Sequence, residues 1–333
     1  MNCFNQSSGA FLLPNAYDLK IASSIIKSGN LVAVPTETVY GLAGNALNES
    51  AIKKIFETKK RPLTDPLIVH VHSLEQVFSL THLSHIKNVD KLFEAFWPGA
   101  ITLIFPKKPT VPSLVTAGLD SIAVRMPSHP VFRSLLKLCN VPLAAPSANP
   151  FAYVSPTSAQ HVRDSFGLEL PVIDGGTCLH GVESTVLSLL DPIEPVVLRP
   201  GPVSVEAISS VLDLKVKSSQ DVSDPDTLSR SPGMMKKHYS PNSSLVLFDS
   251  PEDLREFDLG SSVVICIQKH QNLFPAKEWV FLSKKGDINE AAKNVFSELR
   301  KWDSKYDKIY FQRFPNSEIG IAVNDRLKRA AAQ

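Results

Sequence analysis

The sequence predicts two α/β domains joined by a linker. Its 333 residues exceed the length of one typical domain. Short apolar runs alternate with helix-like patterns as far as residue 212, and a similar alternation resumes at residue 242. The segment between them is rich in Ser, Asp, Pro and Lys, which is typical of linkers. We therefore expect a first domain at 1–212, a linker at 213–241 and a smaller domain at 242–333.

The first domain is expected to contain a mixed sheet. Its strand-length apolar runs are interleaved irregularly with helical patterns, so the sheet need not be purely parallel. The expected strands are 31–36, 66–72, 101–106, 121–127, 141–147, 184–190 and 195–200. The expected helices are 16–28, 49–59, 73–80, 131–139, 158–166 and 204–212.

The second domain has the pattern of a small three-layer, Rossmann-like α/β domain. Strands are expected at 244–248, 262–267, 278–283 and 308–314, with a helix at 289–302.

The composition is that of an ordinary globular protein. Apolar residues make up 43% of the chain and charged residues 20%, and 35 Lys and Arg nearly balance 33 Asp and Glu. This balance argues against binding of nucleic acid by bulk charge, so any affinity for phosphate must be local. The four cysteines show no metal-ligand spacing, and no signal-peptide or membrane-span pattern is present. These features predict a cytoplasmic protein that does not enter a membrane.

Three consecutive cations, Lys59, Lys60 and Arg61, run directly into Pro62. The helix 49–59 should end near Arg61, because proline disfavours helical geometry at the residue before it. A helix carboxyl end is itself a poor anion site, so an anion here would have to be bound by the side chains. From composition alone, a solvated cationic face is the simpler interpretation.

The next strand has two different faces. Leu67, Val69 and Val71 share one face, whereas His70 and His72 share the other. The first face suits a core, and the second can present imidazole to a ligand. The H-x-H spacing also suits a metal, but no third ligand cluster accompanies it, so metal binding is the weaker alternative.

Other predicted strands also carry polar groups at or near their ends. The hydroxyl groups of Thr36, Thr38 and Tyr40 are expected to alternate along one strand, and further hydroxyl, amide or guanidinium groups occur at Arg125, Ser147, Asn149, Ser184 and Arg199. No nucleophile elbow, P-loop or G-x-G-x-x-G motif is present. This inventory favours chemistry by positioning and charge stabilisation, such as phosphoryl or nucleotidyl transfer.

The order and spacing of these motifs resemble the YrdC domain. The motifs are PTETVYGL, K-x-R followed by PL-x-VH, SIAVRMP, PSAN, SPT, ESTV and LRPG. Two further motifs, SPGMMKKHYSP and GIAVNDRLKRAA, resemble the long, two-domain form of threonylcarbamoyl-AMP synthase. The resemblance extends from about Ala16 to about Ala331.

This resemblance implies a twisted, mixed-sheet YrdC-like catalytic domain and a defined reaction. The family condenses L-threonine, bicarbonate and ATP, with Mg²⁺, into L-threonylcarbamoyl-adenylate and releases pyrophosphate. The product would pass to a downstream tRNA threonylcarbamoyl transferase complex that makes threonylcarbamoyladenosine in tRNA. Direct contact with tRNA stays open.

The resemblance also implies residue roles. The K-x-R residues Lys59 and Arg61 would be catalytic. ATP would be bound by Lys59, Arg61, Asp65, Ser121, Ser147, Asn149, Ser155, Arg199 and His238. L-Threonine would be bound by Thr38, His70, Arg125, Ala145 and Ser184. No protein side chain is expected as a metal ligand.

The chain departs from the family pattern at three places. Lys60 stands where the family often has Gly, Asp65 where it often has Asn, and Pro150–Phe151–Ala152 where it has small residues. These differences affect the expected geometry of ATP binding. The linker is expected to fold over the pocket as a lid that brings His238 and Tyr239 to the nucleotide.

Two other functions are compatible with the same domain. An RNA-binding module would require a concave basic surface, and the near-neutral charge argues against it. A related carbamoyl transferase would use the same domain on another acceptor, but the zinc-binding and acylphosphatase parts of such multidomain enzymes are missing from this sequence.

Overall fold

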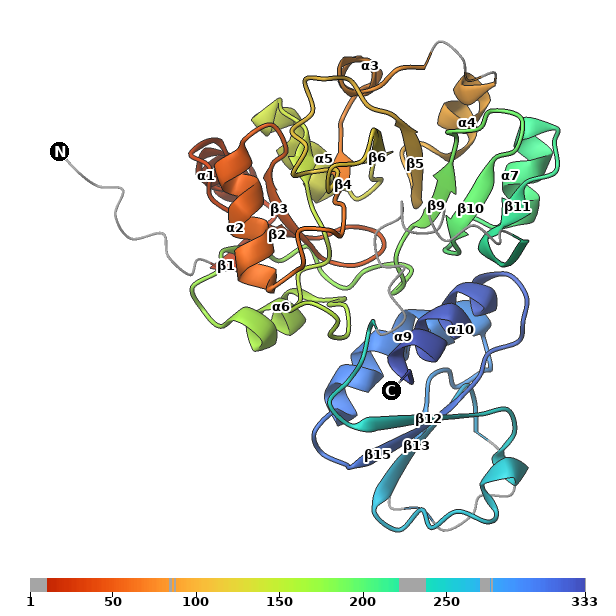
Figure 1. Ribbon diagram of the computed structural model, residues 1–333. Helices are drawn as coiled ribbons and strands as arrows, with labels where there is room; N and C mark the ends of the chain where they lie inside the picture. The colour runs from red at the N-terminus through yellow and green to blue at the C-terminus, as the bar shows by residue number, and fades with distance from the viewer. Residues whose placement is uncertain are drawn as a thin grey trace.

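The computed structural model describes residues 11–83, 86, 88–221, 238–269, 276 and 278–332. The described residues from Phe11 to Asp221 form a large α/β part, and those from Ser244 onward form a smaller α/β part. The helices α9 (Ile288–Trp302) and α10 (Ile319–Ala330) lie between the small sheet and the larger part (Figure 1).

Across the described residues, the larger part contains an 11-stranded mixed sheet in the order β1-β8-β2-β3-β7-β4-β6-β5-β9-β10-β11. Its strands are β1 (Phe11–Leu12), β2 (Val32–Val34), β3 (Gly41–Asn45), β4 (Ile68–His70), β5 (Ile101–Pro106), β6 (Ser121–Arg125), β7 (Leu143–Ala144), β8 (Val172–Ile173), β9 (Thr185–Ser188), β10 (Val196–Arg199) and β11 (Lys217–Ser218). Its helices are α1 (Ala16–Lys27), α2 (Glu49–Lys59), α3 (Leu74–Leu80), α4 (Val89–Phe96), α5 (Pro130–Cys139), α6 (Ala159–Phe166), α7 (Val205–Leu212) and the short η1 (Ser219–Asp221).

Two apolar clusters enclose this sheet. One cluster packs α1 and α5 against β2, β3 and β7 through residues such as Ile26 and Phe132. The other packs α2, α3, α4 and α7 against the sheet through residues such as Ile55 and Leu92. Burial of these apolar side chains is the main force that holds the layers together.

Several helices begin where the sequence provides a capping side chain. The side chains of Asn15, Asn48, Ser158 and Ser204 accept hydrogen bonds from the first free backbone amides of α1, α2, α6 and α7, respectively. The expected helix at 49–59 is confirmed at both ends, because Asn48 caps its start and Lys60 ends it in left-handed geometry.

The smaller part is a parallel sheet in the order β12-β15-β13-β14. Its strands are β12 (Ser244–Phe248), β13 (Ser262–Cys266), β14 (Glu278–Phe281) and β15 (Lys308–Gln312). One face packs on α9 and α10, and the other packs on the segment around η2 (Pro251–Leu254). The helix α10 was not expected from the sequence.

Two expectations about the first domain need correction. The prediction that Thr36, Thr38 and Tyr40 alternate along one strand is wrong. The strand β2 ends at Val34, and Thr36 Oγ1 accepts hydrogen bonds from the amides of Thr38 and Val39 in a local turn. The regular pattern was expected to lapse after residue 212, but β11 pairs in parallel with β10. The first sheet therefore extends into the segment that was expected to be linker.

Candidate functional site

A pocket lies over the face of β4 that carries Ile68 and His70. The opposite face of this strand points into the core through Val69, as the alternating pattern predicted. Gly41 also lines the pocket, and a side chain there would approach Ala145 within 3.1 Å. The full lining consists of Thr36, Thr38, Val39, Gly41, Arg61, Pro66, Ile68, His70, Arg125, Ala145, Pro146, Ser147, Glu183, Ser184, Arg199, His238 and Tyr239.

His70 is a neutral group with capacity to bind a ligand. It is buried, and burial together with the nearby Arg125 lowers its pKa to about 3. Its Nδ1 atom has no hydrogen-bond partner among the residues that the structure describes. An unpartnered buried nitrogen that belongs to a pocket residue is a natural contact for a polar ligand.

Arg125 lies beside His70 because β4 and β6 pair in parallel with these residues opposite one another. Its guanidinium forms an ion pair with Glu37 at 2.6 Å and donates a hydrogen bond to Thr38 Oγ1 at 2.9 Å. Burial opposes the charge of Glu37, but the charge and hydrogen bond of Arg125, together with backbone hydrogen bonds, outweigh burial, and the pKa of this carboxyl falls to about 2. Glu37 is therefore ionised at neutral pH and orients the arginine.

The end of α2 carries the K-x-R residues in three different environments. Lys60 is exposed and adopts φ 53°, a left-handed conformation that favours glycine. Lys59 is buried, and its ammonium group donates hydrogen bonds to the backbone carbonyls of Ser147 and Asn149. Burial and the neighbouring Arg61 lower the pKa of Lys59. Lys59 thus ties the helix to the loop that carries Ser147.

Arg61 reaches the pocket from the same helix end. Its guanidinium donates to the carbonyls of Asp65 and Pro66 and forms an ion pair with the Asp65 carboxylate at 2.8 Å. Burial lowers the pKa of Arg61, whereas Asp65 counteracts this effect. The Asp65 carboxylate therefore contacts Arg61.

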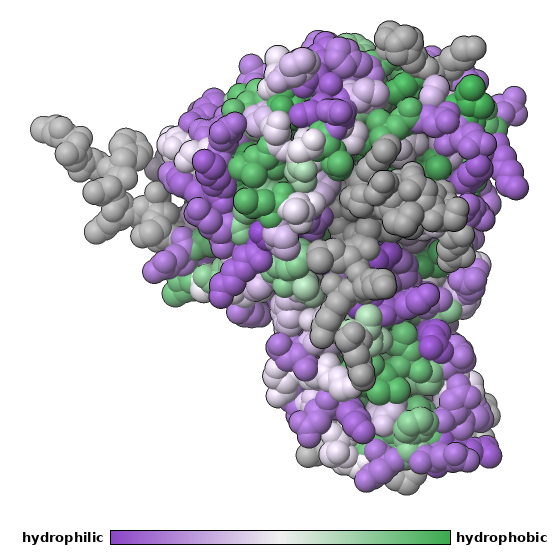
Figure 2. Space-filling model, in the orientation of Figure 1, coloured by the Kyte–Doolittle hydropathy of each residue, from purple (hydrophilic) through white to green (hydrophobic). Residues whose placement is uncertain are grey.

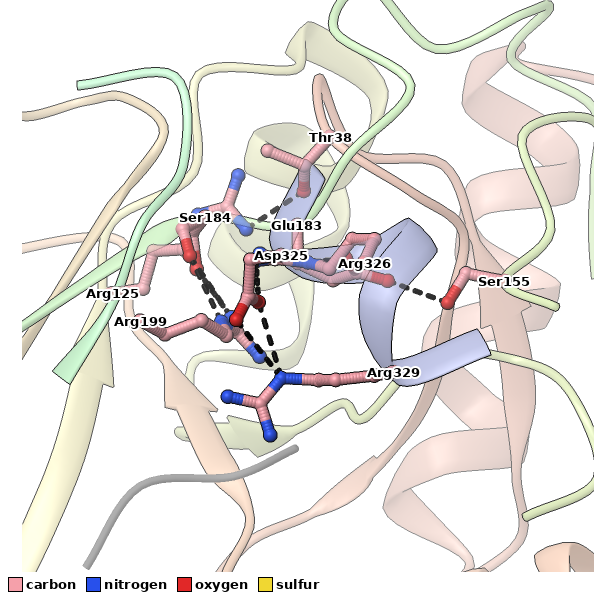
Figure 3. Close-up of polar contacts among 9 residues, drawn as sticks. All are labelled: Thr38, Arg125, Ser155, Glu183, Ser184, Arg199, Asp325, Arg326 and Arg329. Atoms are coloured by element: carbon pink, nitrogen blue, oxygen red, sulfur yellow. Dashed lines mark hydrogen bonds and ion pairs between the residues drawn. The ribbon is translucent and has the colours of Figure 1, made fainter. Parts of the chain in front are cut away.

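A second polar group surrounds Ser184, just before β9. Arg199 donates hydrogen bonds to the carbonyl and the hydroxyl of Ser184, and this hydroxyl also lies 2.8 Å from Thr102 Oγ1. The adjacent Glu183 accepts a hydrogen bond from Ser155 Oγ at 2.5 Å (Figure 3). Ser184 is therefore held by an arginine and a threonine in an arrangement that suits binding rather than nucleophilic attack.

The end of the expected linker also lines the pocket. His238 and Tyr239 are both buried there, and the His238 ring lies 5.8 Å from the Phe151 ring in an edge-on arrangement. Burial and nearby cations, foremost Arg61, lower the pKa of His238 well below its usual value. Residues 222–237 lie outside the described residues, so the lid stays a prediction. Only the end of the expected linker, at His238 and Tyr239, is described, and it lines the pocket.

The structure brings most predicted site residues together. Those that line the pocket are Thr38, Arg61, His70, Arg125, Ala145, Ser147, Ser184, Arg199 and His238. Those that do not are Lys59, Asp65, Ser121, Asn149 and Ser155. Lys59, Asp65 and Ser155 instead contact residues of the pocket wall, and the Asn149 amide donates to the carbonyls of Pro150 and Tyr153. Ser121 begins β6, whereas Arg125 ends it.

Sequence reasoning missed the two acidic residues of the site, Glu37 and Glu183. Both stand inside motifs that carried the resemblance, PTETVYGL and ESTV, so a signal was present. Their importance follows from their buried arginine partners, Arg125 and Arg326.

Neither metal-ligand clusters nor membrane-spanning helices are found in the described part of the chain. No group of three or more His, Cys, Asp or Glu there could hold a metal ion, and His72 instead lies 3.2 Å from Asn140 Oδ1. No described helix is long and apolar enough to cross a membrane. Figure 2 shows hydrophilic surface interrupted by hydrophobic areas on one face of the molecule.

A mixed α/β sheet with this pocket, followed by a small parallel α/β part, defines a YrdC-type protein with a C-terminal domain. Two family models match in the same order: one described as telomere recombination at residues 24–201, and one described as threonylcarbamoyl-AMP synthase, C-terminal domain, at residues 203–332. The chain belongs to the threonylcarbamoyl-AMP synthase family and is an enzyme.

Curated relatives and solved structures agree with this family. The chain is 38% identical to threonylcarbamoyl-AMP synthase of Pyrococcus abyssi, over 95% of this chain and 94% of the relative. It is 39% identical to the enzyme of the same name from Bacillus subtilis, over 93% and 92% of the two chains. The crystal structure of P. abyssi Sua5 complexed with L-threonine superposes with a TM-score of 0.87 at 36% identity, over 97% of each chain. E. coli YciO shares the fold alone, with a TM-score of 0.52 at 22% identity, over 59% of this chain and 97% of that chain.

Proposed function

We propose that the protein makes L-threonylcarbamoyl-adenylate from L-threonine, bicarbonate and ATP, with release of pyrophosphate. The observation that carries this proposal is the pairing of two kinds of polar group in one pocket. His70, Arg125 and Ser184 lie in the same pocket as Arg61 and Arg199. The relative whose structure contains L-threonine supports threonine as one substrate.

The first group of residues suits an amino acid. The Arg125 guanidinium would bind the threonine carboxylate, because guanidinium and carboxylate match in charge and geometry. Thr38 and Ser184 would accept or donate hydrogen bonds at the substrate hydroxyl and amine, and Ala145 would pack against the substrate. The neutral His70 would bind without repelling the ammonium group.

The second group suits the phosphates of ATP. Arg61, Arg199, Ser147 and His238 line the pocket and provide positive charge and hydrogen-bond donors. Mg²⁺ would enter with ATP as part of the substrate and neutralise charge on its phosphates. Lys59, Asp65, Asn149 and Ser155 would act behind these residues, and the role of Ser121 stays a proposal from the resemblance.

The reaction would proceed in two steps. The nitrogen of the threonine amine bonds to the carbon of bicarbonate, and water leaves. The product of this step is a carbamate. A carbamate oxygen then attacks the α-phosphorus of ATP, the bond to the bridging oxygen breaks, and pyrophosphate leaves with the electron pair. Arg61 would stabilise the charge that develops on the transferring group.

The product would be used for the threonylcarbamoyl modification of tRNA. A separate transferase complex would receive it, and no direct contact between this chain and tRNA is required. We further propose a cytoplasmic location, where ATP and tRNA are available.

Pyrophosphate release measured with full-length protein tests the proposal. Release should require L-threonine and bicarbonate together, because both supply atoms of the attacking carbamate. Equal release with either one omitted would exclude the reaction. RNA binding with a steep salt dependence, and without pyrophosphate release, would instead favour an RNA-binding module.

A further inference from the structure

Arg326 is a fully buried arginine that comes from the C-terminal part of the chain. Its Nε atom donates to Glu183 Oε2 at 2.9 Å, and its Nη1 atom donates to Asp325 Oδ2 at 2.8 Å. Figure 3 shows α10 with Asp325, Arg326 and Arg329 beside Glu183 and Ser184. The pocket lining includes Glu183 but not Arg326, so Arg326 lies behind the wall.

Glu183 connects this arginine to the pocket. One carboxylate oxygen accepts from Arg326 and the other from Ser155. The next residue along the chain, Ser184, accepts from Arg199, and Thr185 donates its amide to the Ala100 carbonyl at the start of β9. A movement of the Glu183 carboxylate would therefore disturb Ser184 through the backbone and, with it, the contact of Ser184 with Arg199, and both of these residues line the pocket.

Tyr239 is the second element that Arg326 supports. The guanidinium carbon lies 5.5 Å from the centroid of the Tyr239 ring, a distance at which a cation is attracted to an aromatic face. The Tyr239 ring also lies 4.1 Å from the His238 ring and 5.8 Å from the Phe296 ring of α9, measured between ring centroids. The linker end is thus packed against the C-terminal part.

We propose that Arg326 is a positioning residue through which the C-terminal domain completes the ATP side of the pocket. Arg326 balances the negative charge of Glu183 and holds Tyr239 in place. The pocket wall that faces the anionic nucleotide therefore carries no carboxylate whose charge is left unbalanced. This inference rests on the proposed use of ATP. It assigns a function to the C-terminal domain at the pocket without requiring that domain to touch either substrate.

The physical reason is the charge of Glu183. A buried carboxylate that loses its cationic partner keeps a negative charge in a medium of low dielectric, or moves to find solvent. Either change disfavours ATP, whose phosphates are anionic, more than threonine, which carries both charges. We expect Arg326→Met to raise the KM for ATP at least about tenfold, with a much smaller change in the KM for threonine.

A matched control exists in the same domain. Arg313 forms an ion pair with Asp249 at 3.1 Å, and both side chains are substantially exposed. Arg313→Met removes the same charge by the same substitution and should leave both KM values unchanged. Arg326→Lys keeps the charge but loses the planar guanidinium, so it should recover part of the ATP affinity.

A double variant separates positioning from general damage. In Arg326→Met combined with Glu183→Gln, the unbalanced carboxylate is removed together with its partner. The KM for ATP should return most of the way to that of Glu183→Gln alone. An unchanged KM in Arg326→Met, or an equal loss for both substrates that Glu183→Gln does not repair, would overturn the proposal.

Hydrogen exchange supplies a readout that needs no nucleotide. The amides of Thr185 and Ser240 donate to the carbonyls of Ala100 and Ala152 at 3.0 and 2.8 Å. Both amides should exchange faster in Arg326→Met than in Arg313→Met, and unchanged exchange would contradict the positioning role. If the wild-type protein did not bind ATP, the proposed function would be wrong. The hydrogen-exchange rates would still show whether Arg326 positions the pocket wall, because they are measured without nucleotide.

Discussion

The Asp65 carboxylate lies 2.8 Å from the Arg61 guanidinium, and both side chains are buried. The pair joins the end of α2 to the segment that precedes β4. Because Arg61 lines the pocket and Asp65 does not, the acid balances the arginine from behind. The charge that Arg61 offers to a nucleotide is therefore partly offset.

Asp65→Asn should strengthen the interaction of Arg61 with ATP. The guanidinium would keep its hydrogen bonds to the Asp65 and Pro66 carbonyls, so its position should persist. We expect the KM for ATP to fall roughly three- to tenfold and the free energy of unfolding to fall by about 1–3 kcal/mol. Steady-state kinetics and chemical denaturation measure the two effects. A higher KM would show that Asp65 assists nucleotide binding directly.

Arg61→Ala should abolish most adenylate formation and spare threonine binding. Loss of one contact that stabilises charge in the transition state can lower the rate about 100- to 1,000-fold. Threonine affinity, measured by calorimetry, should stay within about twofold, since the proposed threonine contacts are made by other side chains. A parallel loss of threonine binding would indicate that Arg61 is mainly structural.

Lys60→Gly should leave product formation unchanged and stabilise the fold slightly. Lys60 is exposed with φ 53°, a conformation that costs a non-glycine residue about 1–2 kcal/mol. Glycine relieves this cost but loses more entropy on folding, so a net gain of about 0.5–1 kcal/mol is expected from denaturation curves. If turnover fell instead, Lys60 would have to contact the nucleotide.

His70 should make stability depend on pH below neutrality. Its pKa is about 3 in the folded chain and about 6.5 when unfolded, so the unfolded chain binds the extra proton between these values. The contribution of His70 to the free energy of unfolding should be fully present above a pH of about 6.5. Below that pH, the free energy of unfolding should fall by up to about 1.4 kcal/mol per pH unit until pH 3 is reached.

His70→Asn isolates this contribution from those of the other histidines. The difference in unfolding free energy between wild type and variant should shrink as the pH falls from 6.5, and threonine binding should be weaker in the variant at pH 7. A constant difference across this range would mean that His70 is charged in the folded protein.

Removal of the C-terminal part should destabilise the part that remains. Val39, Val154 and Val182 are buried in one apolar cluster with residues of α9, α10 and the small sheet. In a chain that ends at Asp221, each would be exposed at a cost of roughly 1.5 kcal/mol or more. We expect a lower melting temperature and little product, measured by calorimetry and pyrophosphate release. A fully stable, fully active fragment would contradict the interface.

Much of the local structure could be predicted from short-range patterns. The helical pattern at 49–59 and the position of Pro62 predicted where α2 lies and ends, and this is confirmed. The alternation around Val69 correctly predicted that His70 faces away from the core. The helix α10 was missed because Gly320, Ala322 and Arg326 stand among its buried positions, so small and charged residues interrupt the apolar pattern.

The sequence by itself determined what depends on neighbours a few residues apart: helix limits, the faces of strands and the motifs that mark the family. Only the tertiary structure decided which charges meet. Glu183 and Arg326 are separated by 143 positions, and Thr38 and Arg125 by 87. Such contacts exist because strand pairing and domain docking bring distant segments together, and a buried charge is stable only where another charge or donor balances it. No local pattern encodes that pairing.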